Sequence, residues 1–426
     1  MSLVLGVISD DFTGATDLAN NLVRAGMRTL QVIGIPKTDL TLENIDAVVV
    51  ALKSRSCPMS EGVNISLAAL EWLQDQGARQ IYFKYCSTFD STDAGNIGPV
   101  ADALLERLEA KQTVMVPAFP ANNRTVYQGH LFVGDRLLND SGMENHPLNP
   151  MRDADLVRTL SRQTDHSVGL LARSELSAGV QTSWDHLERL ATQGVRHVIC
   201  DTLDETDLAT LAAVVVKLPL VTGGSGLGQA LPAEYRRLGW LDIVDQAGRL
   251  EPASGGALVL SGSCSRATLM QIKHFLASHG GFALDPLALA KDETHIGHAL
   301  DFARQRLSSK APVLIYASAT PDKVRQAQDQ LGAAVAGECI EQALAIIASE
   351  LVADGVGRLL VAGGETSGAV VSALGICELR IGDQIDPGVP WTQAYLVGKP
   401  APLSLALKSG NFGGVDFFSR AFEVLL

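Results

Sequence analysis

The stretch Leu3–Asp17, with the sequence LVLGVISDDFTGATD, joins an apolar run to a polar turn and the start of a helix. The run Leu3–Ile8 has the length and β-branched content of a strand, and Leu18 and Leu22 continue a helical pattern that stops at Gly26. A buried strand that leads straight into an amphipathic helix is the first half of a βαβ unit. This stretch therefore predicts an α/β fold with a parallel sheet.

The same alternation of short apolar runs and longer amphipathic stretches continues along the chain. In the first half, further strands are expected at Leu30–Ile35, Ala47–Leu52, Gln80–Phe83, Thr113–Val116, Val195–Cys200 and Leu218–Val221. In the second half, strands are expected at Ala257–Leu260, Val313–Ala317, Arg358–Ala362 and Ala394–Val397, and helices at Arg266–Ser278, His295–Leu307, Pro321–Leu331 and Gln342–Ala353.

A polar, turn-rich stretch, Asp245–Gly256, separates the two halves and is typical of a domain boundary. The predicted fold class is therefore α/β, with two α/β domains that have mainly parallel sheets, residues 1–245 and 256–426. Ligands of such sheets bind at the carboxyl ends of the strands. We expect the active site in the cleft between the two domains.

Length and charge limit the classes of function. With 426 residues, the chain exceeds the size at which one hydrophobic core usually keeps growing. Lys plus Arg number 34 and Asp plus Glu number 47, and the net charge of −13 disfavours nucleic acid and anionic membrane surfaces as partners. No apolar stretch approaches the roughly 20 residues that span a bilayer, and the six cysteines include no C-x-x-C pair. We expect a cytoplasmic protein with reduced thiols, and a homo-oligomer is compatible with the sequence.

Two adjacent carboxylates, Asp10 and Asp11, follow the first strand and precede its helix. A single aspartate at this place usually caps the helix, because its carboxylate satisfies N–H groups of the first turn. Two in a row, followed by Thr13-Gly14, favour a ligand site, where a carboxylate can bind sugar hydroxyls or accept a proton. Neighbouring residues that leave a strand point in opposite directions, so we expect one aspartate to cap the helix and the other, by a slight preference Asp11, to face the ligand.

Cations and hydroxyl groups follow two further strands. Arg55 comes after the third expected strand, with Lys53 a weaker alternative, and Lys84 comes after the fourth, before Ser87 and Thr88. Taken alone, such a Ser/Thr run is usually an ordinary turn. Together with the two aspartates at the same sheet edge, it suits a small anionic sugar, whose carboxylate would pair with the cations and whose hydroxyls would bond to the Ser and Thr side chains.

The second half contains three turns rich in Gly, Ser and Thr, at Ser261–Thr268, Gly363–Gly368 and Lys408–Gly414. Backbone N–H groups at such turns bind anions, and glycine lets phosphate oxygens approach closely. No Walker A motif occurs. One such turn is usually only a turn, but three in one α/β domain indicate phosphate binding, and Thr222–Gly228 in the first half is a less specific fourth.

Five motifs in the same order resemble the four-carbon acid sugar kinase family. They are SDDFTGATD at Ser9–Asp17, KYCSTFDSTDAGNIG at Lys84–Gly98, SGSCS at Ser261–Ser265, GGETSG at Gly363–Gly368 and LKSGNFG at Leu407–Gly413. The resemblance covers both halves and implies an ATP-dependent kinase with an N-terminal acid-sugar domain and a C-terminal nucleotide-binding domain. Phosphoryl transfer of this kind also implies Mg²⁺. The sequence does not identify protein ligands of the metal.

Within that family, the Lys84–Gly98 run is similar to the 3-oxo-tetronate kinase branch, which implies transfer to the 4-hydroxyl of a 3-oxo-tetronate (3-dehydro-tetronate). Threonate and erythronate kinases tend to carry a K-x-D-S-T-x-R-G-N-like version, from which this chain departs at Cys86, Phe89 and Ala94-Gly95. They are the alternative among enzymes, and a non-catalytic acid-sugar binding protein is the alternative outside them.

The family pattern also implies which residues act in this chain. Implied catalytic and acid-sugar contacts come from Asp10, Asp11, Arg55, Lys84, Ser87 and Thr88, and implied nucleotide contacts from Ser261, Gly363, Gly364, Glu365, Thr366 and Gly410. Asp10 and Asp11 are the candidates for the group that accepts the proton of the attacking hydroxyl, and the carboxylates of Glu365 and Asp383 are the alternative.

Overall fold

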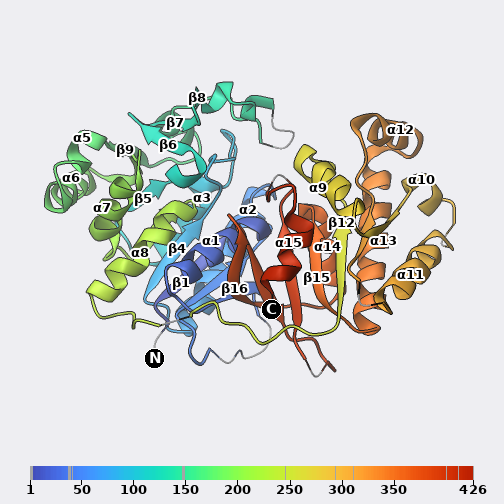
Figure 1. Cartoon of the computed structure of the whole chain (residues 1–426). Helices are drawn as coiled ribbons and strands as arrows, with labels where there is room; N and C mark the ends of the chain where they lie inside the picture. Colours follow the sequence, from blue (N-terminus) through green and yellow to red (C-terminus); the bar gives the residue numbers. More distant parts are fainter. Residues whose placement is uncertain are drawn as a thin grey trace. The chain divides into compact units, whose positions relative to one another are not determined.

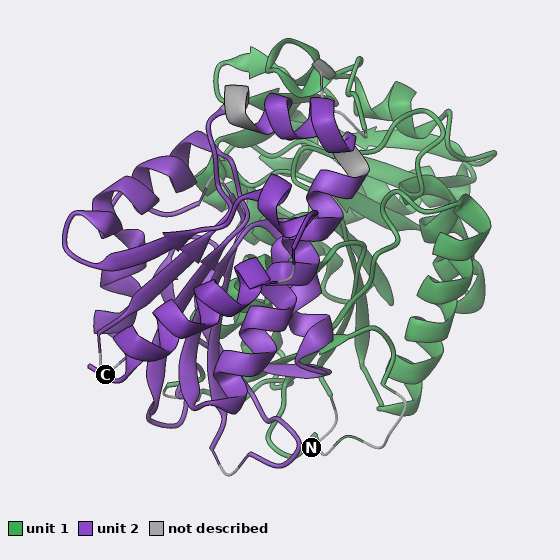
Figure 2. Ribbon diagram, turned by 90° about the vertical axis from the view of Figure 1, so that its right-hand side faces the viewer, with its two compact units in different colours: residues 1–247 green, residues 248–426 purple. Residues whose placement is uncertain are grey.

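The computed structural model describes residues 3–36, 40, 42–145, 149–244, 246–292, 294–309, 311–399, 401–410 and 412–425. The chain divides into two compact units, residues 1–247 and 248–426, coloured separately in Figure 2. The division falls within the polar stretch that the sequence suggested as a boundary, although Asp245 itself lies outside the described residues.

The first unit contains a parallel sheet with the strand order β2-β3-β1-β4-β11-β5-β10-β9. Its strands are β1 (Leu5–Ser9), β2 (Thr29–Ile33), β3 (Ala47–Ala51), β4 (Gln80–Lys84), β5 (Thr113–Val116), β9 (Ser167–Leu171), β10 (Val195–Cys200) and β11 (Leu220–Gly223). β3 has the sequence AVVVA and is buried at every position, as expected of a strand that helices cover on both faces.

Helices join these strands and cover the sheet (Figure 1). They are α1 (Phe12–Arg24), α2 (Met59–Asp75), α3 (Ile97–Arg107), α4 (Leu156–Leu160), α5 (Arg173–Leu176), α6 (Val180–Thr192), α7 (Glu205–Val215) and α8 (Ser225–Arg237). α1 packs against α8, α8 against α7 and α7 against α6, whereas α2 packs against α3. The arrangement is a doubly wound α/β layer whose strands all end at the same edge.

A small antiparallel sheet follows β5. It consists of β6 (Arg124–Tyr127), β7 (His130–Val133) and β8 (Arg136–Leu137), with short 3₁₀ turns at Pro120–Asn122, Leu138–Asp140 and Met143–Asn145. The buried carboxylate of Asp201, just after β10, accepts hydrogen bonds from the N–H groups of Gln128 and Gly129, both at 2.9 Å. These bonds attach the turn of the hairpin to the main sheet.

The second unit has a mixed sheet with the order β13-β14-β12-β15-β18-β17-β16. Its strands are β12 (Gly256–Ser261), β13 (Gly280–Ala283), β14 (Val313–Tyr316), β15 (Val356–Ala362), β16 (Glu378–Asp386), β17 (Val389–Ala394) and β18 (Leu403–Lys408). The first five strands in this order, β13, β14, β12, β15 and β18, are parallel to one another. β17 and β16 extend the sheet with antiparallel pairing. The predicted fold class, two α/β domains with mainly parallel sheets, is confirmed.

The helices of the second unit are α9 (Arg266–Leu276), α10 (Pro286–Leu289), α11 (Thr294–Leu307), α12 (Pro321–Leu331), α13 (Ala333–Ala353), α14 (Gly364–Ala373) and α15 (Phe417–Val424). Among the described residues, no single helix is both long and apolar enough to cross a bilayer. The pair α12 and α13 reaches that length and composition together, but with a bend of 108° between its two parts.

Two sequence predictions in the second unit are wrong. The expected strand Ala394–Val397 overlaps β17 only at Ala394, and Val397 is fully exposed in the turn that follows. The apolar residues of that turn resemble a strand but have no neighbouring chain to pair with in the sheet. Helix α13 begins at Ala333 rather than at the expected Gln342, because its small apolar residues do not produce a clear helical stripe.

Candidate active site

The first unit brings together residues that follow three neighbouring strands. β1 lies between β3 and β4, and its last residue, Ser9, pairs with Ala51 and with Lys84. The N–H of Asp10 donates to the carbonyl of Lys84 at 3.0 Å, and the carbonyl of Asp10 accepts from the N–H of Arg55 at 3.1 Å. Asp10, Arg55 and Lys84 therefore meet at one edge of the sheet.

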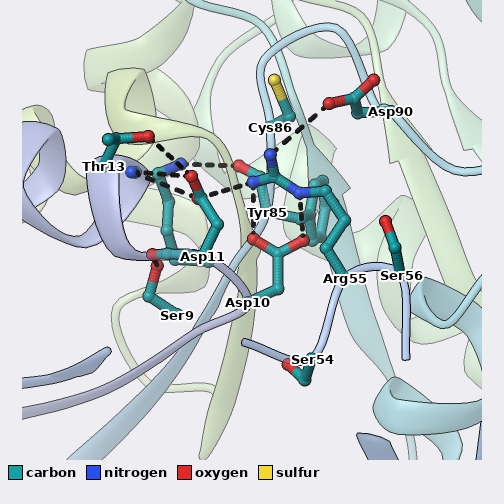
Figure 3. Close-up of polar contacts among 12 residues, drawn as sticks. Ser9, Asp10, Asp11, Thr13, Ser54, Arg55, Ser56, Tyr85, Cys86 and Asp90 are labelled. Atoms are coloured by element: carbon teal, nitrogen blue, oxygen red, sulfur yellow. Dashed lines mark hydrogen bonds and ion pairs between the residues drawn. The ribbon is translucent and has the colours of Figure 1, made fainter. Parts of the chain in front are cut away.

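The guanidinium of Arg55 lies at the centre of this group (Figure 3). Its Nε and Nη2 donate to the two carboxylate oxygens of Asp10 at 2.9 and 2.7 Å, which is a bidentate pair. Nη2 also donates to Asp11 at 2.6 Å, and Nη1 lies 3.4 Å from Asp90. Arg55 is thus bonded to three carboxylates of the chain itself and joins them at this edge.

Asp11 caps helix α1 and is also the more accessible of the two aspartates. Its carboxylate accepts from the N–H of Gly14 at 3.1 Å and from the hydroxyl of Thr13 at 2.8 Å. The side chain is 23% exposed, compared with 6% for Asp10. The expectation that Asp10 caps the helix is therefore wrong, because Asp11 is the cap. The slight preference for Asp11 as the residue that faces the ligand stays a prediction. The two-pronged bond to Arg55 turns Asp10 into the sheet edge instead.

The charges around Asp11 determine its protonation. Burial raises its pKa, but the positive charges of Arg55 and then Lys84, with the hydrogen bonds of the cap, outweigh burial and hold that pKa below its ordinary value. Asp11 is therefore ionised at neutral pH. An ionised, partly exposed carboxylate can accept a hydrogen bond or a proton from a ligand hydroxyl.

Lys84 is buried beside the start of α1. Its Nζ donates to the carbonyl of Tyr85 at 2.7 Å, and a Cβ added to Gly14 would lie 3.1 Å from the same Nζ. Gly14 thus gives the ammonium group room next to the helix. Lys84 contributes a positive charge that acts on Asp11 and Asp17.

Sequence reasoning did not single out two aspartates of this site, Asp17 and Asp90. Asp17 of α1 accepts a hydrogen bond from the hydroxyl of Ser225 at 2.5 Å, and burial raises its pKa although Lys84 opposes the shift. Asp90 contacts Arg55 as described above. Both residues lie within motifs of the sequence, Asp17 in Ser9–Asp17 and Asp90 in Lys84–Gly98, and this position is the signal that could have identified them.

The predicted hydroxyl contacts lie in the turn after β4. Thr88 is buried, and its Oγ1 lies 3.0 Å from the Sγ of Cys86, whereas Ser87 is half-buried. The glycine turn after β11 packs against the neighbouring backbone. A Cβ on Gly223 would lie 2.4 Å from the carbonyl oxygen of Val116 at the end of β5, and one on Gly224 would lie 2.5 Å from that of Pro117. Close packing therefore explains these glycines without a phosphate.

The three Gly-rich turns of the second unit follow adjacent strands. Ser261, the last residue of β12, pairs with Ala362 of β15, and Ala362 pairs with Lys408 of β18. The N–H of Gly262 donates to the carbonyl of Ala362 at 3.1 Å, and the N–H of Gly363 donates to the carbonyl of Lys408 at 2.9 Å. The structure thus brings the three turns together at one sheet edge.

The second turn opens helix α14. Gly363 is its N-cap, with a φ of +128° that side chains rarely adopt. Gly364 and Glu365 are exposed in the first helical turn, and Thr366 is buried. A Cβ on Gly262 would lie 2.2 Å from the Oγ1 of Thr366, so the first and second turns pack closely at this glycine.

The other predicted nucleotide contacts have partners within the protein. The hydroxyl of Ser261 is buried and lies 2.8 Å from that of Ser318. The carbonyl of Gly410 accepts a hydrogen bond from Thr268 at 2.9 Å, which joins the third turn to the first turn of α9. Asn411 of the same motif lies outside the described residues.

A cavity of about 900 Å³ opens beside the first turn, at the carboxyl ends of β12 and β14. This volume lies in the range of small-molecule sites, which are mostly apolar with a few polar groups. Its lining includes Cys264, Leu269, Ile272, Leu284, Tyr316, Ser318 and Ile340. Sequence reasoning missed this cavity, because its apolar residues have the same pattern as core residues.

Metal ligands are not gathered at either edge. Within the part of the chain that the structure describes, no group of three or more His, Cys, Asp and Glu side chains could hold a metal ion.

Comparison with known proteins agrees with this division of the chain. A family model described as a sugar-binding N-terminal domain matches residues 5–231, and one described as a nucleotide-binding C-terminal domain matches residues 258–418. The two groups of turns described above lie one in each matched region.

Full-length relatives are also found. The 3-oxo-tetronate kinase of Burkholderia multivorans is 54% identical over 99% of this chain and 97% of its own length. That of Cupriavidus necator is 52% identical over the same shares. A crystal structure of a Haemophilus influenzae protein is 43% identical, with a TM-score of 0.85 over 99% of this chain and 100% of that one.

Proposed function

Since this chain belongs to the four-carbon acid sugar kinase family, we propose that it transfers the γ-phosphoryl group of ATP to the 4-hydroxyl of a 3-oxo-tetronate. The observation that carries the kinase function is the meeting of three Gly-rich turns beside the 900 Å³ cavity. The full-length likeness to 3-oxo-tetronate kinases supports the choice of acid sugar.

The edge of the first unit would bind the acid sugar. Asp11 is ionised and partly exposed, so it can orient the 4-hydroxyl and accept its proton. Arg55 and Asp10 hold Asp11 in place through their bidentate pair. Lys84 with the turn at Ser87 and Thr88 supplies the further polar groups that a small hydroxy acid needs.

The turns of the second unit would bind the nucleotide. The exposed first turn of α14, at Gly364 and Glu365, presents N–H groups to a phosphate, and Thr366 and Gly410 support the adjacent turns. The apolar cavity beside Ser261 suits the base and the sugar of ATP. Mg²⁺, when bound to the phosphates, would neutralise the charge that develops during transfer.

The transfer itself requires few covalent steps. The 4-hydroxyl oxygen forms a bond to the γ-phosphorus while the bond from that phosphorus to the β–γ bridging oxygen breaks and ADP leaves. The proton of the hydroxyl passes to the carboxylate of Asp11. The products are ADP and the 4-phosphate of the acid sugar.

A coupled ADP-release assay over a panel of four-carbon acids and their 3-oxo forms tests this function. The proposal expects the highest kcat/KM with a 3-oxo-tetronate. Preference for threonate or erythronate would assign the chain to the other branch. Binding of the acids without any ADP release would identify a non-catalytic binding protein.

Two isosteric variants test the proton acceptor. Asp11→Asn should reduce kcat by about two to four orders of magnitude with the fold intact. Asp10→Asn should mainly lower stability, since it weakens the bidentate bond to Arg55. Wild-type turnover in both variants would remove the pair from the mechanism and direct attention to Glu365 and Asp383.

A further inference from the structure

The ammonium group of Lys408 lies beneath the third turn and is surrounded by uncharged oxygens. The side chain is fully buried, and Nζ lies 3.0 to 3.1 Å from the carbonyls of Ser409, Gly410 and Phe412 and from the hydroxyl of Thr268. Among the described residues, no carboxylate lies within ion-pair distance of this Nζ. Three N–H donors are shared among four acceptors. Lys408 therefore has no donor left for a phosphate.

The bonds to Lys408 fix the direction of the peptide units in the turn. In a trans peptide the carbonyl and the following N–H point in opposite directions, and the described residues contain no cis bond. Because the carbonyls of Ser409 and Phe412 point at Lys408, the N–H groups of Gly410 and Gly413 point away from it. Neither of these N–H groups has an acceptor in the part of the chain that is described.

Gln271 of α9 reinforces this direction. Its Nε2 donates to the carbonyls of Phe412, Gly413 and Gly414 at 3.0, 2.9 and 3.0 Å. The N–H of Gly414, which is turned outward in the same way, donates to the carboxylate of Asp386 at 2.8 Å. One outward N–H of this turn therefore already binds an anionic oxygen.

The third turn also touches the first. A Cβ on Gly410 would lie 2.6 Å from the Oγ of Ser263, so the backbone of Gly410 packs directly against the turn before α9. Building on the kinase function proposed above, we propose that Lys408 is a positioning residue. It holds the carbonyls of the third turn inward, so that the N–H groups of Gly410 and Gly413 are presented to the phosphates of ATP.

This role differs from that of a lysine that contacts phosphate directly, and it depends on the positive charge. The elements packed against β18 contribute uncharged neighbours to Lys408, such as Thr268 of α9 and Ala362 of β15. Helix α14 also packs against β18, and its Glu365 is exposed in the first helical turn. With burial as its cause, the pKa of Lys408 falls from 10.5 to about 8. The neutral amine has two N–H donors for the same four oxygens, so the turn loosens as the proton is lost.

Calorimetric titration of the full chain with Mg·ATP, in the absence of acid sugar, tests the role of Lys408. Lys408→Met should weaken ATP binding by about tenfold or more, since the turn loses its internal donor. Lys399→Met is the matched control, because Lys399 also donates to two backbone carbonyls, those of Val352 and Ala353, both at 3.0 Å. The control, and acid-sugar binding in both variants, should stay within about twofold of wild type.

A second measurement needs no variant of Lys408. ATP affinity of the wild-type chain and of Lys399→Met should fall as pH rises from about 7 to about 10. A folded Lys408→Met with wild-type ATP affinity, or a wild-type ATP affinity that is constant over this range, would overturn the proposal. Failure of the proposed kinase function would give a different result: the wild type would bind ATP but release no ADP with any acid of the panel.

Discussion

Lys84 in the first unit and Lys408 in the second occupy the same place in their sheets and have different surroundings. Each is the last residue of a buried strand, and each donates to the carbonyl of the next residue. Lys84 interacts electrostatically with Asp11 and Asp17, whereas the partners of Lys408 among the described residues are neutral oxygens. A buried cation at the carboxyl end of a strand can thus neutralise carboxylates or organise the backbone. The difference depends on the residues that neighbouring strands bring to it.

Replacing Arg55, the cation that is bonded to the carboxylates near Lys84, should have the largest effect on turnover and stability. Arg55→Met leaves Asp10, Asp11 and Asp90 without their guanidinium, and breaking a buried pair from one side costs about 3–5 kcal/mol. We expect loss of turnover and a large fall in unfolding free energy, measured by urea denaturation and ADP release.

The exposed pair Arg107–Glu71 provides the control for Arg55. Its side chains are 51% and 58% exposed, so Arg107→Met should change stability by less than about 1 kcal/mol. Equal losses in Arg55→Met and Arg107→Met would show that the carboxylates of the first edge do not need their counter-charge.

Exchanging either lysine for methionine should separate the two ligands. Lys84→Met should weaken acid-sugar binding by about 10- to 150-fold, the value of a charge-assisted hydrogen bond, with ATP binding unchanged. Lys408→Met should show the opposite pattern. Calorimetric titration of each variant with both ligands measures this, and parallel losses of both ligands in one variant would contradict the comparison.

Glycine substitutions sharpen the comparison at the second edge. Gly262→Ala would place a Cβ 2.2 Å from the Oγ1 of Thr366, and overpacking of this kind costs about 1–3 kcal/mol. Gly364→Ala meets no atom within 4 Å, so its stability should stay near wild type. If Gly364→Ala nevertheless weakens ATP binding, the ligand itself approaches that position. Thermal unfolding with and without Mg·ATP distinguishes a loss of stability from a loss of ATP binding.

The smallest effect concerns stability and pH. The folded chain holds the proton of Lys408 less tightly than the unfolded chain, so between pH about 8 and 10.5 the unfolded chain binds more protons. The contribution of Lys408 to unfolding free energy should therefore rise with pH across this window, while ATP affinity falls. Urea unfolding of wild type and Lys408→Met at pH about 7.5 and 9.5 measures the difference, and a difference that falls with pH would contradict the lowered pKa.

Much of the site could be predicted because strand ends in a parallel sheet share one edge. Residues after short apolar runs, such as Arg55 and Lys84, could be assigned to that edge from the sequence alone. The partners of each side chain could not, because Arg55 and Asp10 are 45 residues apart and their bidentate bond depends on strand order. The cap of Asp11 on Gly14 is local, whereas the greater exposure of Asp11 depends on the long-range pair that holds Asp10.

The sequence by itself determined the α/β class and the turns that carry the polar groups, since local apolar periodicity and glycine content specify these features. Only the tertiary structure decided what each charged group faces. Lys84 and Lys408 are the same residue type at the same kind of strand end, and folding places one near the charges of Asp11 and Asp17 and the other among carbonyls. Electrostatic energy depends on distances between groups that are remote in the chain, and those distances exist only once the sheet has formed.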